Sequence, residues 1–305
     1  MNAAFNRVFS QNRSYDEWVW KYAQCPWGFA FTVAGSPTGQ VLSHFAAIPT
    51  LFLVHGHERL VGQGVDAFRV ELGDASPNDP NVYRATARAF FEEYCRNGSL
   101  ELLYGLAGRR HARVLTTHLG WQAVGELEAY EAAVQRPKVR GPFRHLVFGF
   151  HRGYWSDLWN KTRLRCSVVA VRNEAFVRWR FLSHPHRPYR FAFSMSDGEA
   201  AAAAVLRVRG DICYLVDLLW DGRSAQSLKV LLSGVARLAA DWNCRTLLTW
   251  LQGDREASAV FLDEGWRPSL AFSEITVTAI SARPDLNPRT FWEHAYVTMA
   301  DGDLV

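Results

Sequence analysis

The sequence predicts an α/β protein of the α+β type, in which two similar domains follow one another and each holds a mixed sheet flanked by helices. Three observations predict this class. The length of 305 residues suits two ordinary domains. Short phrases of the first half return in the second half. Apolar runs typical of strands alternate with amphipathic stretches typical of helices, which excludes a disordered or coiled-coil chain.

Three phrases recur in the same order, and this indicates an internal duplication. The pairs are Trp20-Lys21-Tyr22 with Trp179-Arg180-Phe181, Val65-Asp66 with Val216-Asp217, and Gly120-Trp121 with Gly265-Trp266. Their offsets are 159 (179 − 20), 151 (217 − 66) and 145 (265 − 120). One such match arises easily by chance, but three in register do not. We therefore expect two diverged copies of one domain.

Each half reads as a hairpin, a strand, a helix, a second strand and a second helix. In the first half, the expected ranges are 29–33 with 40–49, 64–70, 81–96, 100–106 and 109–118. In the second half, they are 190–194 with 201–207, 212–219, 225–241, 246–251 and 255–263. A strand–helix–strand order favours parallel strands joined by right-handed crossovers, so we expect a parallel pair in each half.

The stretch from Gln135 to Arg165 interrupts this repeated order. It opens with a basic, proline-containing segment and resembles neither half. We therefore place one domain at residues 1–135, a linker with extra elements at 136–165, and a second, more diverged domain at 166–305.

Charge and hydropathy exclude several kinds of partner. The net charge is +4 and no window gathers five or six cations, so we expect no nucleic-acid partner. No apolar run is long enough to span a membrane, and the first residues lack the apolar core of a secretory signal. The sequence therefore predicts a cytoplasmic protein without a membrane partner.

Cysteines and histidines give no metal site. The five cysteines are too far apart for a CxxC or zinc-type spacing, so we expect free, mostly buried thiols. His55 with His57 and His184 with His186 have a spacing that can bind a metal from a strand, but no third ligand lies near them. Motifs for nucleotide binding, zinc proteolysis and serine hydrolysis are also absent.

Five segments carry a resemblance to a known family. They are Glu17-Trp18-Val19-Trp20-Lys21-Tyr22, Ser43-His44-Phe45-Ala46-Ala47-Ile48-Pro49, Val65-Asp66, His118-Leu119-Gly120-Trp121 and residues 292–303. With the order of the elements, they make the chain similar to the GNAT acetyltransferase superfamily, and more closely to bacterial two-domain GNAT-like proteins. The similarity spans nearly the whole chain. It implies two tandem GNAT-like domains, each with a centrally splayed sheet.

The resemblance implies a binding mode for acetyl-CoA, which is a co-substrate in that superfamily. Its pantetheine arm lies between two separated parallel strands, and its pyrophosphate binds the loop and helix that follow the first of them. On this chain, the resemblance assigns acetyl-CoA to the first domain and to Phe68, Arg69, Val70, Asn81, Val82, Tyr83 and Arg84. The family's glycine-rich loop signature, R/Q-x-x-G-x-G/A, is absent here, and Asp74 and Asp79 put negative charge where phosphates would lie.

Direct transfer of an acetyl group to a small amine, such as an amino sugar, needs a base for the amine and an acid for the leaving thiolate. The resemblance points to Asp66 and Glu71 as carboxylates, and to His111 in place of the family's tyrosine. Each residue also has a plain structural interpretation. Asp66 has a counterpart in Asp217 and can be structural, and Glu71 can be a solvated loop residue. His111 can belong to a basic helix face that meets solvent or the 3′-phosphate of CoA.

Two other functions stay open. Both phosphate loops lack the signature and the expected tyrosine is missing, so the chain can instead be an inactive GNAT-like module for binding or dimerisation. A homodimer is compatible with either function. Transfer from aminoacyl-tRNA is a third alternative, which the modest net charge of +4 disfavours.

Overall fold

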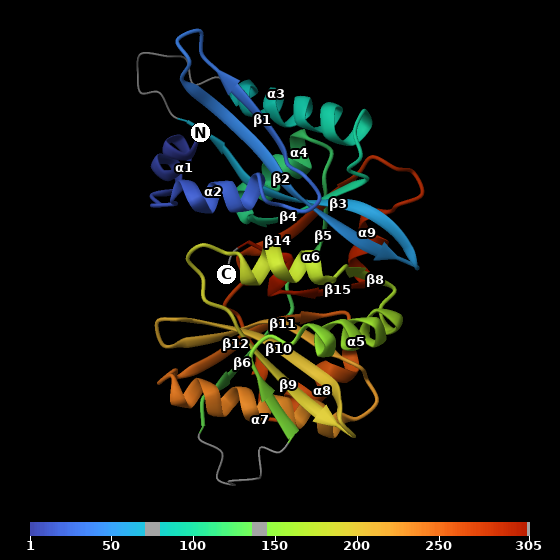
Figure 1. Cartoon of the computed structure of the whole chain (residues 1–305). Helices are drawn as coiled ribbons and strands as arrows, with labels where there is room; N and C mark the ends of the chain where they lie inside the picture. The colour runs from blue at the N-terminus through green and yellow to red at the C-terminus, as the bar shows by residue number, and fades with distance from the viewer. Residues whose placement is uncertain (71–79, 136–144, 304–305) are drawn as a thin grey trace. The chain divides into compact units, whose positions relative to one another are not determined.

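The computed structural model describes residues 1–70, 80–135 and 145–303 (Figure 1). The chain divides into two units, each with strands and helices of its own. Unit 1 comprises Met1–Glu126, Ser183–His186 and Glu274–Glu293. Unit 2 comprises Leu127–Leu182, Arg187–Ser273 and His294–Val305. Glu71 and the rest of the predicted phosphate loop, residues 71–79, lie outside the described residues.

The strands of unit 1 follow the order β5-β14-β4-β3-β2-β1 among the described residues. In that order they span Gln122–Glu126, Ile275–Ser281, Leu102–Gly108, His57–Arg69, Val41–Val54 and Ala30–Gly35. β3 and β4 run parallel, which confirms the pair expected from the strand–helix–strand order. The other neighbours run antiparallel, so the sheet is mixed.

Helices cover both faces of this sheet. They are α1 (Asn2–Phe9), α2 (Tyr15–Tyr22), α3 (Pro80–Phe91), α4 (Arg109–His118) and α9 (Pro288–Glu293), and α3 continues as a π-helical turn over Glu92–Arg96. α1 packs on Phe68 of β3 and on Val70, which follows β3. Ser14 caps α2 by accepting a hydrogen bond from the backbone of Glu17. Successive side chains of a strand point to opposite faces, so α3 and α4 cover the alternate residues on the other side.

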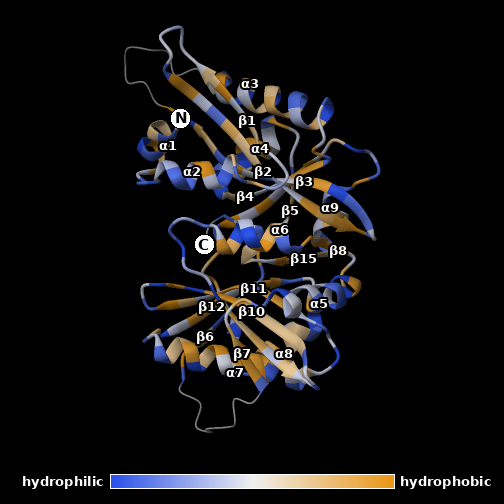
Figure 2. Ribbon diagram, in the orientation of Figure 1, coloured by the Kyte–Doolittle hydropathy of each residue, from blue (hydrophilic) through white to orange (hydrophobic). Residues whose placement is uncertain are grey.

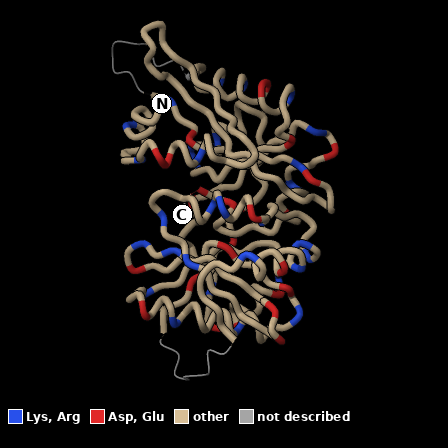
Figure 3. The backbone as a smooth tube through the Cα atoms, in the orientation of Figure 1, with Lys and Arg blue, Asp and Glu red and all other residues tan. Residues whose placement is uncertain are grey.

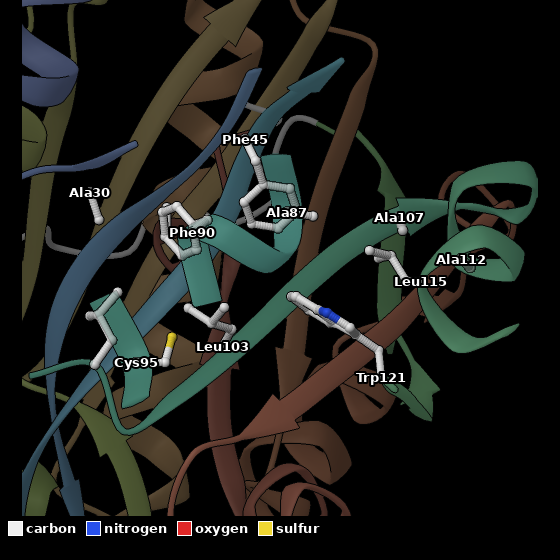
Figure 4. Packing of buried hydrophobic residues seen from close by; sticks show 12 residues of the cluster. Ala30, Phe45, Ala87, Phe90, Cys95, Leu103, Ala107, Ala112, Leu115 and Trp121 are labelled. Atoms are coloured by element: carbon white, nitrogen blue, oxygen red, sulfur yellow. The ribbon is translucent and has the colours of Figure 1, made fainter. Parts of the chain in front are cut away.

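The hydrophobic cluster under α3 and α4 fixes these helices on the parallel strands (Figure 4). The ring of Phe45 on β2 lies 5.0 Å from that of Phe90 on α3 and 6.3 Å from that of Trp121, between ring centroids. Leu103 of β4 and Leu115 of α4 are each only 1% exposed. Full burial stabilises a side chain of this size by about 1.5–3 kcal/mol.

The strands of unit 2 follow the order β8-β15-β12-β11-β10-β9-β7, and β6 pairs with β12 and β13. The main strands span Val168–Ala170, Ala295–Thr298, Thr246–Gln252, Ile212–Trp220, Glu199–Arg209, Arg190–Ser196 and Leu146–Phe148, and β6 and β13 span Ala129–Ala133 and Arg267–Pro268. β11 and β12 are parallel, which confirms the pair expected in the second half.

The helices of unit 2 pack on these strands. They are α5 (Arg152–Thr162), α6 (Glu174–Val177), α7 (Ala225–Asp241) and α8 (Arg255–Asp263), and α6 continues as a π-helical turn over Arg178–Leu182. The bounds of α7 and α8 agree with the predicted ranges. Figure 2 shows hydrophilic and hydrophobic colours together on α7, as an amphipathic helix requires, whereas β9 and β10 are mostly hydrophobic.

Two strands belong to a different unit from the one that their position in the sequence predicts. β6 falls within the range 1–135 but pairs with β12 of unit 2, and β14 falls within 166–305 but pairs with β4 and β5 of unit 1. β7 and α5 fall within the range 136–165, expected as a linker with extra elements, and belong to unit 2. The units therefore differ from the three consecutive ranges, because strand pairing joins residues far apart in the chain.

Candidate active site

The two parallel strands of unit 1 separate halfway along their length. They pair from Val61 with Leu102 to Gly64 with Gly105. Beyond these pairs β3 continues to its last residue, Arg69, and β4 also continues, but the described residues form no further pairing between the two strands. α4 begins directly after β4, so the separated strand ends lead toward the first turns of α3 and α4.

A β-bulge at Asp66 follows the last parallel pair. His44 of β2 pairs with Phe68, whereas Ala46 pairs with Val65, so β3 carries an extra residue in this interval. Asp66 has a φ of 49°, in the left-handed region that aspartate and asparagine tolerate better than most other residues. The sequence therefore places one of the few suitable residue types where β3 bends away from β4.

The carboxylate of Asp66 is buried in a cluster of donors from the first two helices and their loop. Lys21 Nζ donates to Oδ1 at 2.7 Å, and the Tyr22 hydroxyl donates to Oδ2 at 2.6 Å. Arg13, in the loop between α1 and α2, also donates to Oδ2. Burial acts to raise the pKa of Asp66, but the charges of Lys21 and Arg13 outweigh it and hold the pKa well below its ordinary value.

This environment suits a structural aspartate better than a general base. A general base needs an oxygen directed at the substrate and a pKa near the working pH. Asp66 instead stays ionised at neutral pH, and three donors engage its oxygens. His44 adds a further contact to the bulge, because its Nδ1 lies 2.7 Å from the backbone carbonyl oxygen of Asp66. The cluster thus ties the bulge to α2 and to β2.

Three predicted cofactor residues lie at the end of β3: Phe68 and Arg69 are its last residues, and Val70 follows it. The Val70 N–H donates to the Leu42 carbonyl, and the Phe68 carbonyl accepts from the Ser43 hydroxyl at 3.1 Å. These groups therefore point toward β2. Because backbone groups of successive residues point to opposite edges of a strand, those of Arg69 point away from β2. The side chains of Phe68 and Val70 pack under α1.

The other predicted cofactor residues form the first turn of α3. They are Asn81, Val82, Tyr83 and Arg84, and Asn81 is exposed while the other three are half-buried. The first turn of this helix contains no acidic residue. The partial positive charge of the helix N-terminus and the guanidinium of Arg84 therefore both favour an anion here.

Tyr83 and His111 join the first turns of α3 and α4. The Tyr83 hydroxyl lies 2.6 Å from His111 Nε2, within hydrogen-bond distance. Burial raises the pKa of Tyr83 and lowers the pKa of His111. Both groups are therefore neutral near pH 7. The structure thus brings together two residues that the sequence assigned to different tasks, cofactor binding and catalysis.

Unit 2 contains a corresponding separation of parallel strands. β11 pairs with β12 from Ile212 with Thr246 to Leu215 with Thr249, and both strands then continue without pairing to each other among the described residues. A shift in the register of β11 against β10 lies just beyond the last parallel pair, next to Asp217. The two units therefore share a parallel pair, a bulge and a separation in the same order.

In unit 2 the chain itself fills this separation. Thr298 of β15 pairs with Leu251 of β12, and the Tyr296 hydroxyl donates to the Leu218 carbonyl of β11 at 2.6 Å. β15 thus bridges the two separated strands. Gly253, with a φ of 81°, follows β12 and lies so close to the backbone of β15 that a Cβ atom there would collide with it.

A buried ion network anchors the same segment. Arg172 donates to Asp217 Oδ2 at 2.9 Å and to Asp301 Oδ2 at 2.7 Å, and the Thr298 hydroxyl donates to Asp217 at 2.7 Å. The side chains of Arg172 and Asp217 have no exposed surface. Burial acts to lower the pKa of Arg172, but the two carboxylates outweigh it and raise the pKa.

The arginines of the two clusters stand at equivalent places in the sequence. Arg13 binds Asp66 and Arg172 binds Asp217, and their offset of 159 (172 − 13) equals that of the tryptophan phrases. The recurring phrases included the aspartates but not these arginines. The equal offset was a signal in the sequence that could have identified them.

The fold is that of the GNAT superfamily. The chain aligns with a GCN5-related N-acetyltransferase from Anabaena variabilis at a TM-score of 0.66 and 9% identity, over 92% of this chain and 69% of that one. It aligns with an Enterococcus faecalis protein described as a probable N-acyltransferase at 0.65 and 12% identity, with the same coverage. It also aligns with Saccharomyces cerevisiae N-myristoyltransferase, solved with bound myristoyl-CoA, at 0.54 and 10% identity, over 85% of this chain and 74% of that one.

No protein-family model and no curated protein matches the sequence. The structural likeness, at identities of 9–12%, therefore concerns the fold. Within the described residues, no group of three histidine, cysteine or carboxylate side chains could hold a metal ion. No helix in that part of the chain is long and apolar enough to cross a membrane.

Proposed function

We propose that this protein is an acyl-CoA-dependent N-acyltransferase, and that unit 1 binds the CoA thioester between β3 and β4. The observation that carries the proposal is the contrast between the two separations. The described residues place no strand between the separated ends in unit 1, whereas β15 lies between them in unit 2. The structural neighbours support acyl transfer in general, since two are described as acyltransferases and a third was solved with an acyl-CoA.

The residues of unit 1 fit such a ligand. Separated strands suit an extended chain such as pantetheine, and β3 and β4 continue past Gly64 and Gly105 without pairing to each other among the described residues. The first turn of α3 combines the helix N-terminus with Arg84, which suits a diphosphate. We propose acetyl-CoA as the donor and a small amine, such as an amino sugar, as the acceptor.

In the proposed reaction, the amine nitrogen bonds to the acyl carbon, the carbon–sulfur bond breaks, the amine loses a proton and the thiolate gains one. We propose His111 for proton exchange, because it is neutral and lies on the first turn of α4, after β4. Tyr83 then holds the His111 ring through its hydrogen bond. Asp66 acts indirectly, by keeping the bulge of β3 in place. Glu71 stays a candidate carboxylate.

A non-catalytic role is the second candidate, and it applies to unit 2. The segment Ala295–Thr298 and its buried ion network occupy the separation there, so a thioester could bind only after the segment left. We propose that unit 2 is a diverged copy of the same domain that does not bind the donor and serves as a binding or dimerisation module.

Titration calorimetry with CoA and acetyl-CoA tests the proposal. Arg84→Ala should weaken binding about tenfold, the size expected for one charge-assisted hydrogen bond to phosphate. Arg223→Ala is the matched control, because it removes an exposed arginine just before α7, the helix that follows β11 in unit 2. Binding that is lost in the Arg223 variant but kept in the Arg84 variant would move the site to unit 2. No binding at millimolar ligand would overturn the acyltransferase proposal.

A further inference from the structure

Two glycines form the last parallel pair in unit 1, at the point where β3 and β4 begin to separate. Gly64 of β3 pairs with Gly105 of β4, and the strands continue beyond them without pairing to each other among the described residues. Glycine in the interior of a strand weakens the strand and often marks a place where a ligand or another backbone approaches closely. The glycine pair therefore directs attention to the inner end of the proposed donor site.

The corresponding pair in unit 2 carries side chains. Leu215 of β11 and Thr249 of β12 form the last parallel pair there, and Leu215 follows Gly64 at the offset of 151 (215 − 64) that also relates the two aspartates. Both residues are buried, and the Thr249 hydroxyl donates to the Leu215 carbonyl at 2.8 Å. A side chain thus bonds one strand to the other where unit 2 begins to separate, whereas the pair in unit 1 has no side chains.

In unit 1 the ring of Trp121 lies over the two glycines. A Cβ atom at Gly64 would lie 3.6 Å from Trp121 Cη2, and one at Gly105 would lie 3.5 Å from Trp121 Cζ3. The ring therefore spans both strands at the point where they separate. Trp121 is buried and belongs with Phe45 to the cluster under α3 and α4 (Figure 4). It closes one face of the sheet at the inner end of the separation.

Buried side chains close the opposite face as well. Gln63 and Tyr104 form the preceding parallel pair, so they point away from the Trp121 face, and both are buried. Gly64 itself is half-buried. Asp66 is also half-buried as a residue, although its side chain is only 4% exposed, so the exposed surface there belongs mainly to the backbone. The inner end thus combines accessible backbone with buried side chains on both faces.

The paired parts of these two strands carry no charge. Residues 61–65 of β3 and all residues of β4 are uncharged, and Figure 3 marks the charged positions of the chain in blue and red. Asp66 follows directly, but its carboxylate is engaged by three donors. A charged group placed at the inner end would lose its hydration without gaining a counter-charge from the strands, which is unfavourable.

We propose that Trp121 and the pair Gly64–Gly105 form the acyl end of the donor site and restrict the donor to short, uncharged acyl groups. This inference rests on the proposed function, which puts the CoA diphosphate at the first turn of α3 and therefore the thioester toward the inner end. The glycines leave room for a group about the size of the side chains that they lack. The ring of Trp121 stands where a longer acyl chain would continue.

Gly64→Ala is the most direct test, because the fold should tolerate a methyl group there. The atoms nearest to the added Cβ are the Tyr104 carbonyl oxygen at 3.4 Å and Trp121 Cη2 at 3.6 Å, and the φ of Gly64 lies outside the left-handed region. Gly35→Ala on β1 is the matched control, since its Cβ would lie 3.6 Å from the Gln40 carbonyl oxygen. In titration calorimetry, the ratio of the Kd of acetyl-CoA to that of CoA should rise about tenfold in Gly64→Ala and stay unchanged in Gly35→Ala.

Trp121→Leu tests the ring itself, because it shortens the side chain and keeps it apolar. The wild type should bind octanoyl-CoA at least about tenfold more weakly than acetyl-CoA, and Trp121→Leu should reduce this preference about tenfold. Thermal unfolding shows whether each variant is folded. If Trp121→Leu does not fold, Gly64→Ala decides alone.

The outcomes separate this inference from the proposed function. Equal affinity of the wild type for acetyl-CoA and octanoyl-CoA would overturn the inference and leave the acyltransferase proposal standing, as would an unchanged ratio in Gly64→Ala. Succinyl-CoA that binds as tightly as acetyl-CoA would overturn the restriction to uncharged groups. A wild type that binds neither CoA nor any thioester would overturn the proposed function itself.

Discussion

The Tyr296 hydroxyl donates a hydrogen bond to the backbone carbonyl of Leu218, and so β15 is tied to the separated part of β11. A strand edge that has lost its neighbour presents unpaired backbone groups, and these need a partner when they are buried. In unit 2 the chain supplies that partner itself. In unit 1 the described residues supply no strand at the corresponding edge, which is why we assign the external ligand to unit 1.

Asp66 and Asp217 show that the two separations are built alike. Each aspartate lies at or beside the bulge that follows the last parallel pair, and each binds an arginine from an earlier segment. The remaining partners differ. Lys21 and Tyr22 complete the cluster around Asp66, whereas Thr298 of β15 completes the cluster around Asp217. The aspartate and its arginine are common to both clusters, whereas β15 contributes a residue to the cluster in unit 2.

Asp66→Asn should destabilise unit 1 by about 3–5 kcal/mol, because it leaves Arg13 and Lys21 buried without their counter-charge. Asparagine tolerates the left-handed backbone, so the loss reports the missing charge and acceptor oxygen of the carboxylate, not backbone strain. Urea unfolding measures it, with Asp16→Asn, at an exposed position on α2, as the control. A stable Asp66→Asn protein without activity would instead assign Asp66 as the base.

The ion cluster around Asp66 should also make the stability of unit 1 depend on pH in the acid range. The folded-state pKa of Asp66 lies below its ordinary value, so its contribution is fully present above the unfolded pKa of about 3.9 and is lost as the pH falls toward the folded value. The stability difference between wild type and Asp66→Asn should therefore be constant above about pH 5 and shrink below about pH 4. A difference that grows on acidification would contradict the ion cluster.

Gly253→Ala should destabilise unit 2 by about 2–4 kcal/mol, because the added methyl group meets the backbone of β15 and adopts an unfavourable φ. Gly198→Ala is the matched control: Gly198 has a similar φ of 83° but no atom within 4 Å of the added methyl group. The difference between the two variants in urea unfolding isolates the contact with β15. Equal losses would show that β15 does not hold this position in solution.

A fragment of residues 1–135 should fail to fold on its own. It lacks β14, which pairs with both β4 and β5 and buries Val277 and Ala279 almost completely. Circular dichroism and thermal unfolding should show no cooperative transition, whereas the full chain should show one. Addition of a peptide of residues 274–293 should restore structure in part. A cooperative transition of the fragment alone would favour the predicted domain at 1–135.

The sequence predicts the local elements well and the exchange of strands poorly. α4, α7 and α8 agree with their predicted ranges because their apolar spacing and end signals are local. β6 and β14 are short strands whose partners lie more than a hundred residues away in the sequence, and β15 pairs with β12 across several intervening elements. No local pattern of residues specifies such pairings. The parallel pairs β3–β4 and β11–β12 were predicted, because both halves of the sequence repeat the same strand–helix–strand order.

The candidate site was likewise predicted from the sequence only in part. Position in the repeat was enough to single out Asp66, and its likeness to Asp217 pointed to the structural role that the ion cluster supports. Its donors come from α2 and the loop before it, about 45 residues earlier, so only the fold brings them together. The link between Tyr83 and His111 likewise joins two helices through side chains alone, without any spacing to reveal it.

The fall in kcat/KM at acid pH, the acid limb of the pH–rate profile, should report the protonation of His111. Burial lowers its pKa from the ordinary value of 6.5, so the neutral form should persist, and kcat/KM should stay constant, to a pH below 6.5. His111→Gln should remove this limb along with most of the activity. Because burial lowers the pKa and the Tyr83 hydroxyl does not, Tyr83→Phe should reduce kcat/KM without moving the limb. A limb at or above pH 6.5, or an unchanged profile in His111→Gln, would show that another group exchanges the proton.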